Sequence, residues 1–67
     1  MNGIGLIVYY DVDRKNDEFL LKTNATDRTI LPNIDNHVVI NEVVYTVKSI
    51  AFNYDEYKIF IFVKKAY

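Results

Sequence analysis

Few side chains of this sequence could take part in hydrolytic or transfer chemistry. His37 supplies the single imidazole, with Asp35 and Asn36 beside it, and Ser49 and a few threonines are the candidate nucleophiles. Such chemistry needs a nucleophile, a base and an electrophilic stabiliser held together. A solvent-exposed histidine at the start of a strand is the preferred interpretation of His37. The sequence therefore predicts that the chain is not an enzyme and has no catalytic residues.

A hard cation could be held by an acidic group between the ends of a hairpin. The carboxylates concerned are Asp11, Asp13, Asp17 and Glu18. Their spacing lacks the glycine and the closing glutamate of an EF-hand loop, and basic residues interrupt them at positions 14 and 15. The chain also has no cysteine. A solvated acidic turn is favoured, and we predict no metal and no cofactor.

The clearest binding signal is the stretch KIFIFVKK, residues 58–65. In a β-strand, Ile59, Ile61 and Val63 point to one side, and Phe60 and Phe62 point to the other. The small core of a 67-residue chain explains one of these apolar sides. The other side has to be covered by something else.

Short runs of β-branched and aromatic residues, separated by Asn- and Asp-rich breaks, predict an all-β fold. Two runs flank Asn41-Glu42, which is typical of a two-residue hairpin turn. A bulge near Lys48-Ser49 would turn Ile50 and Phe52 back to the core. In the irregular segment 24–36, Leu31 and Ile34 are expected to plug one end of the core. The expected strands are residues 4–12, 18–23, 37–40, 43–52 and 57–65.

Composition and length predict one small domain, residues 1–67. The chain is 51% hydrophobic, which is too apolar for a disordered chain, and its net charge is −1. The apolar start has no basic region and no cleavage site of a signal peptide, and no apolar run is long enough to cross a bilayer. We expect a cytoplasmic protein. Five short strands of this kind favour a small antiparallel barrel of the SH3-like or OB-like type, mostly in up-and-down order.

One pattern runs through residues 28–63 and comprises Arg28, Leu31-Pro32, Ile34-Asp35, Val38, Ile40-Asn41, Tyr45, Val47, Ile50, Tyr54-Asp55, Ile59, Ile61 and Val63. It resembles short uncharacterised proteins of bacteriophages and mobile elements that have an SH3-like small β-barrel. Asn41-Glu42 stands where that pattern has Asn-Gly. The resemblance implies the fold and a phage source, hence the host cytoplasm, and brings no active site with it.

A protein-binding surface is the preferred explanation of the second face of the last strand. In such a barrel the last strand lies at a sheet edge or closes against the first, with the two phenylalanines outside. They would form an apolar patch of a few hundred Å², on the order of a functional patch. The partner would be a second copy, giving a homodimer or higher oligomer, or a host or defence protein that the chain inhibits. The candidate partner-binding residues are Phe60, Phe62, Tyr9, Ile7 and Tyr57.

Two alternatives stay open. The barrel could curl, or the segment 24–36 could fold over, so that one chain buries both faces. Alternatively, exposed aromatic rings and nearby lysines could bind single-stranded nucleic acid by base stacking, as small barrels do. The net negative charge speaks against this second alternative. Its candidate residues are Tyr54, Tyr57, Lys58, Lys64 and Lys65.

Overall fold

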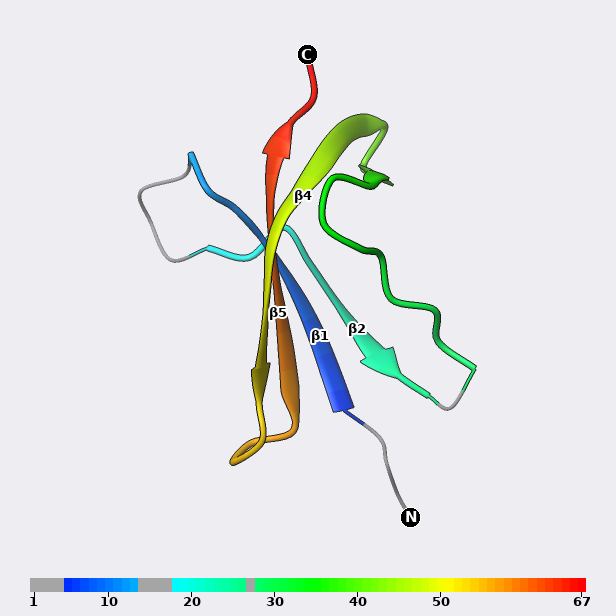
Figure 1. The fold of residues 1–67 in the computed structure, drawn as a ribbon, viewed down its shortest axis with the longest axis vertical. Coiled ribbons are helices and arrows are strands. Elements are labelled where there is room, and N and C mark those ends of the chain that lie inside the picture. Colours follow the sequence, from blue (N-terminus) through cyan, green and yellow to red (C-terminus); the bar gives the residue numbers. More distant parts are fainter. Residues whose placement is uncertain (1–4, 14–17, 27) are drawn as a thin grey trace.

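The computed structural model describes residues 5–13, 18–26 and 28–67, and these form an all-β fold. Five strands make one curled sheet that has the shape of a half-barrel (Figure 1). The strands are β1 (Gly5–Asp11), β2 (Leu21–Ala25), β3 (His37–Ile40), β4 (Val43–Asn53) and β5 (Lys58–Lys65). The predicted residues Ile4, Arg14, Lys15 and Asp17 lie outside the described ranges.

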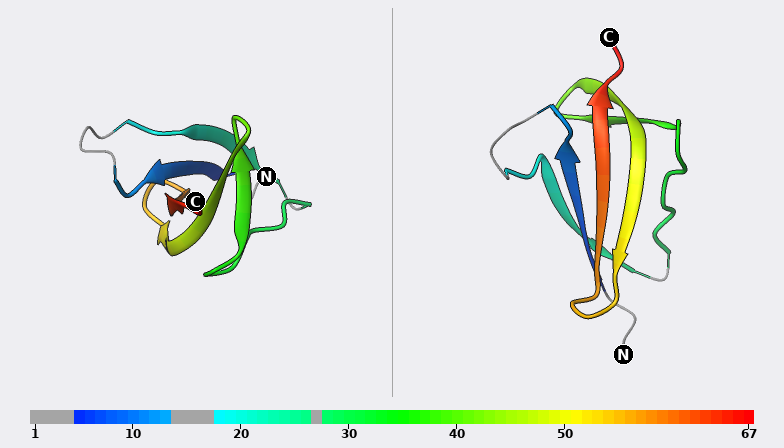
Figure 2. Two further views of the ribbon diagram at one scale, coloured as in Figure 1. Left: turned by 90° about the horizontal axis from the view of Figure 1, so that it is seen from above. Right: turned by 60° about the vertical axis from the view of Figure 1, so that its left-hand side comes forward.

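The strand order decides one expectation about the sheet and corrects another. It runs β2-β1-β5-β4-β3, so the last strand, β5, does not lie at an edge but closes against β1, the second of its two expected positions. β1 and β5 pair in parallel, whereas the other neighbours pair antiparallel, which makes the sheet mixed. Figure 2 shows β1, β5 and β4 side by side along the length of the molecule, with β3 crossing one end.

The hairpin of β3 and β4 confirms the turn expected at Asn41-Glu42. Ile40 pairs with Val43, so two residues form the connection. Asn41 and Glu42 both have positive φ, at 50° and 68°. Two such residues in succession define the type I′ turn, whose twist matches that of the strands. The turn therefore forms with a glutamate at a position that favours glycine.

A bulge in β4 curls the sheet, as the sequence predicts. Val47 pairs with Val63 and Ser49 with Phe62, so Lys48 is the extra residue. Beyond the bulge, Ile50 returns to the inner face and packs against the core. Phe52 also lies on that side, opposite Ile59, but it stays 52% exposed because it lies at the open end of the half-barrel. The expectation that Phe52 joins the core is wrong.

The core fills the concave side of the sheet. Leu31 packs against it from the segment before β3, as expected, whereas Ile34 is exposed and does not plug the core. β2 begins later than expected, at Leu21, and pairs antiparallel with β1. The core residues are Ile7, Ala25, Ile40, Tyr45, Val47, Ile61 and Val63. The described residues contain no helix that is long and apolar enough to span a membrane.

Candidate binding surface of the sheet

An aromatic cluster occupies the outer face of the two central strands. Because paired residues of neighbouring strands point the same way, Val8 lies beside Phe60, and Tyr10 lies beside Phe62. The ring of Tyr10 is 5.9 Å from that of Phe60 and 5.8 Å from that of Phe62, centroid to centroid. All three rings are half-buried, and Val8 between the strands is only 2% exposed, although none of the four belongs to the inner core.

This register corrects the predicted neighbours of the two phenylalanines. Ile7 and Tyr9 were expected beside them, but both face the concave side, where Ile7 is 2% exposed and Tyr9 packs against the core. Burial of the Tyr9 side chain raises the pKa of its phenol above the usual value. Ile7 and Tyr9 therefore belong to the opposite face from Phe60 and Phe62. Tyr10, which the sequence analysis missed, takes their place.

The open end of the half-barrel carries a second group of aromatic side chains. Phe52 and Tyr54 stack with their ring centroids 6.4 Å apart, and Tyr54 is 81% exposed. On the inner side of this stack, an apolar pocket of about 180 Å³ is lined in part by Ala25, Tyr57 and Ile59. On the outer side, Phe52 and Tyr54 line a shallow hollow together with Phe60.

The hollow joins the two aromatic groups into one surface. Phe60 contacts Tyr10 on one side and borders the hollow on the other, so rings follow one another from the sheet centre to the open end. We call this surface the aromatic strip and define it by Tyr10, Phe62, Phe60, Tyr54 and Phe52. Phe52, like Tyr10, was not among the predicted site residues. Phe52 is exposed because it lies at the open end of the half-barrel, and the position of that end depends on how β4 pairs with β5.

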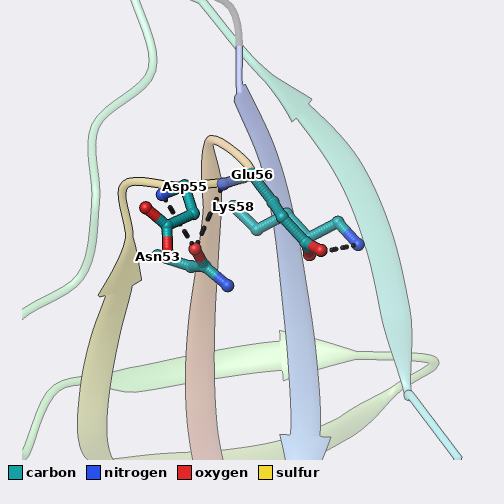
Figure 3. Close-up of polar contacts among 4 residues, drawn as sticks. All are labelled: Asn53, Asp55, Glu56 and Lys58. Atoms are coloured by element: carbon teal, nitrogen blue, oxygen red, sulfur yellow. Dashed lines mark hydrogen bonds and ion pairs between the residues drawn. The ribbon is translucent and has the colours of Figure 1, made fainter.

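The turn between β4 and β5 is held by short polar contacts (Figure 3). The Asn53 side-chain oxygen accepts hydrogen bonds from the backbone N–H groups of Asp55, at 3.0 Å, and Glu56, at 3.1 Å. The ammonium group of Lys58 lies 3.2 Å from the Glu56 carboxylate. An asparagine that accepts two turn N–H groups fixes the backbone without outside help. Tyr54 is therefore presented from an ordered turn.

Tyr57 ends this turn in a conformation that fixes it against β1. Its φ is 55°, and its carbonyl oxygen accepts the N–H of Leu6 at 3.0 Å. A Cβ at Gly5 would lie 2.9 Å from that same oxygen, so the close approach requires glycine. β5 accordingly begins at Lys58 rather than at Tyr57. The Tyr57 ring is mostly exposed and borders the inner pocket, on the other side of the Phe52–Tyr54 stack from the hollow.

The residues predicted for nucleic-acid binding fall into two separate groups. Tyr54, Tyr57 and Lys58 meet around the inner pocket. Lys64 and Lys65 lie at the far end of β5, roughly 20 Å away at the usual rise per residue of a strand. These two also point to opposite faces, because Lys65 is paired with the buried Tyr45 and Lys64 with Thr46.

The candidate chemical residues do not assemble into a cluster in the described structure. His37 is exposed on β3 opposite Thr46, and Ser49 lies opposite Phe62. Asp11 is buried, and its carboxylate accepts the N–H of Asp13 at 2.9 Å. Among residues 5–13, 18–26 and 28–67, no three His, Cys, Asp or Glu side chains come together as a metal site would require.

No known protein family, no curated protein and no solved structure matches the chain.

Proposed function

We propose that this chain is a non-enzymatic protein-binding module that contacts its partner through the aromatic strip. The observation that supports it is the continuity of the strip. Tyr10 contacts Phe60 and Phe62, Phe52 stacks on the largely exposed Tyr54, and the shallow hollow that Phe60 shares with Phe52 and Tyr54 links the two groups. Aromatic side chains are enriched at the centres of protein interfaces and supply much of their binding energy.

The burial of the rings indicates where the binding energy would arise. Phe60 and Phe62 are already half-buried against Tyr10, so covering them completely adds about 1–2 kcal/mol for the pair on side-chain transfer scales. Tyr54 and Phe52 have more surface to bury. We therefore expect the open end of the strip to carry the largest share of the affinity, with the central rings as a rigid floor.

Two versions of the partner follow from the sequence. One is a second copy of the chain, giving a homodimer or a higher oligomer. The other is a host or defence protein that the chain inhibits, as the likeness to SH3-like phage proteins implies. Both versions use the same strip, and both place the protein in the cytoplasm of the cell where it acts.

Replacement of Tyr54 tests this function. Because Tyr54 is exposed, Tyr54→Ser should leave the fold unchanged, and Tyr67→Ser is a matched control at an exposed tyrosine away from the strip. We expect Tyr54→Ser to lower self-association in sedimentation experiments, or retention of a cytoplasmic partner on the immobilised protein, by about tenfold or more. Equal behaviour of the two variants would contradict the proposal.

Single-stranded nucleic acid is the second candidate ligand, because lysines lie on the same outer face as the rings of Tyr10, Phe60 and Phe62. Lys22, Lys58 and Lys64 all occupy outer positions of their strands. However, Tyr10 and Phe62 are nearly parallel, with an interplanar angle of 21° at 5.8 Å, which is an offset stack. Each ring thereby covers part of the face that a base would need. A labelled oligonucleotide at low salt tests this alternative, since binding should weaken steeply as salt rises.

A further inference from the structure

Charge is segregated between the outer face of the sheet and the rest of the molecule. The outer positions of the five strands, all of which the structure describes, include lysines and His37 but no aspartate or glutamate. The acidic residues that the structure describes lie in turns and connections, except Asp11, which is on the inner side and buried. The sheet face around the central rings Tyr10, Phe60 and Phe62 is therefore positive in a chain whose net charge is −1, whereas Asp55 lines the hollow at the open end of the strip.

Three lysines surround the central rings. Lys64 follows Phe62 by two positions along β5, and Lys58 precedes Phe60 by two. Lys22 pairs with Val8, which places it on the opposite side of β1 from Phe60. We call Lys22, Lys58 and Lys64 the lysine rim.

The three lysines differ in whether their ammonium groups already have a partner within the chain. Lys58 is paired with Glu56, and the Lys22 ammonium lies 4.4 Å from the centre of the Phe19 ring. Lys64 is exposed and has no carboxylate within ion-pair distance in the described structure. Lys64 is thus the member of the rim best placed to meet a charge on a partner.

We infer that the partner of the aromatic strip is a segment of a different protein in which carboxylates surround an apolar or aromatic side chain. This inference rests on the proposed protein-binding function and specifies its partner. The apolar side chain packs on the rings, and the carboxylates meet the lysine rim. Complementary charge of this kind speeds association and excludes wrong partners.

The same charges disfavour a second copy in this position. In a two-fold symmetric contact centred on the central rings each copy uses the same patch, so the two lysine rims would lie in one interface. Like charges brought together across an interface weaken it. The rim therefore distinguishes between the two versions of the partner, in favour of the other protein.

Short labelled peptides provide the test with the intact protein. The first peptide alternates glutamate with leucine and tryptophan, the second replaces its glutamates by lysine, and the third replaces its apolar residues by alanine. We expect the first to bind best by fluorescence anisotropy and to weaken with salt, because the exposed lysines are screened. If it does not bind, or binds no better than the other two, the inference is overturned.

Two charge reversals on adjacent residues locate the contact. Lys64→Glu should weaken binding of the first peptide by about tenfold, whereas Lys65→Glu, on the inner side of the same strand, should change it less than about twofold. Equal effects would overturn the inference. Circular dichroism confirms that both variants keep the fold.

The outcomes separate this inference from the function on which it rests. If Tyr54→Ser weakens binding to a protein partner but Lys64→Glu does not, the strip is a binding surface and its partner is not acidic. Tighter binding of a single-stranded oligonucleotide than of the first peptide would assign the face to nucleic acid and overturn both. Self-association that Tyr54→Ser abolishes and Lys64→Glu leaves unchanged would assign the strip to a second copy.

Discussion

The two faces of β5 have the same alternating pattern but contain different kinds of apolar side chain. Ile61 and Val63 on the inner face are 0% exposed and lie at the centre of the core. Phe60 and Phe62 on the outer face are half-buried and contact Tyr10. The branched aliphatic side chains fill the concave side of the sheet, while the rings cover a convex side that no other layer of the described structure protects. An apolar strand position thus indicates burial only when the shape of the sheet is known.

The largest effect that separates the two faces is expected at Ile61. Ile61→Ala leaves a cavity in the core and should lower the free energy of unfolding by about 2–5 kcal/mol. Urea unfolding followed by circular dichroism measures this loss. The control Val39→Ala, at an exposed outer position, should change the stability by less than about 0.5 kcal/mol. Similar values for the two variants would remove the distinction between the faces.

A smaller loss is expected at the neighbouring outer position. Phe62→Ala removes a ring that is half-buried, so the unfolding free energy should fall by about 1–2 kcal/mol, less than for a fully buried phenylalanine. The same urea experiment compares it with Ile61→Ala. A loss as large as that of Ile61→Ala would mean that the outer cluster is a second core. The rings would then leave less apolar surface for a partner to bury.

The hairpin that closes one end of the inner face offers a gain in stability. Glu42 has a φ of 68°, so Glu42→Gly should relieve backbone strain and raise the unfolding free energy by about 0.5–1 kcal/mol. Glu42→Ala removes the same charge but keeps the Cβ, and it should give no gain. A gain in the alanine variant would show that the charge of Glu42, rather than its backbone, limits the stability.

The smallest expected effect is a pH dependence of stability that comes from the inner face. Burial of Tyr9 on the inner side raises its pKa above the ordinary value of 10.0, so the unfolded chain loses this proton at a lower pH than the folded chain. The resulting contribution to stability is complete below the unfolded pKa and is lost as pH rises through the folded one. Thermal unfolding between neutral and strongly alkaline pH should show this loss reduced in Tyr9→Phe. Tyr54→Phe, at an exposed position, should behave as the unchanged protein does.

Local features of the fold could be predicted from the sequence because they depend on neighbouring residues. Asn41 and Glu42 lie between two β-branched runs, and this pattern alone indicates the hairpin turn. The bulge at Lys48 follows from a change of phase in β4, since Ile50 is apolar where strict alternation would expose it. For both features, the residues that predict the structure lie within a few positions of it in the sequence.

Pairing between distant strands could not be predicted in this way. Alternation shows that Phe60 and Phe62 share a face, but it does not show that β1 will be their neighbour in parallel. Tyr10 and Tyr9 have equal apolar character, and only the register decides which of them meets the phenylalanines. Of the five residues of the aromatic strip, the sequence therefore indicated Phe60 and Phe62 for a protein partner and Tyr54 only for nucleic acid, whereas Tyr10 and Phe52 required the sheet order.

The central position of β5 also determines when the chain can fold during synthesis. The hairpins β1–β2 and β3–β4 can each form as soon as their own residues have left the ribosome, because their contacts are local. In the described structure no strand pairing joins the two hairpins except through β5, which lies between them and is translated after all the other strands. A nascent chain that stops before Lys58 would consequently contain two unpaired hairpins whose apolar faces are exposed to solvent. Chaperones bind such exposed apolar surface.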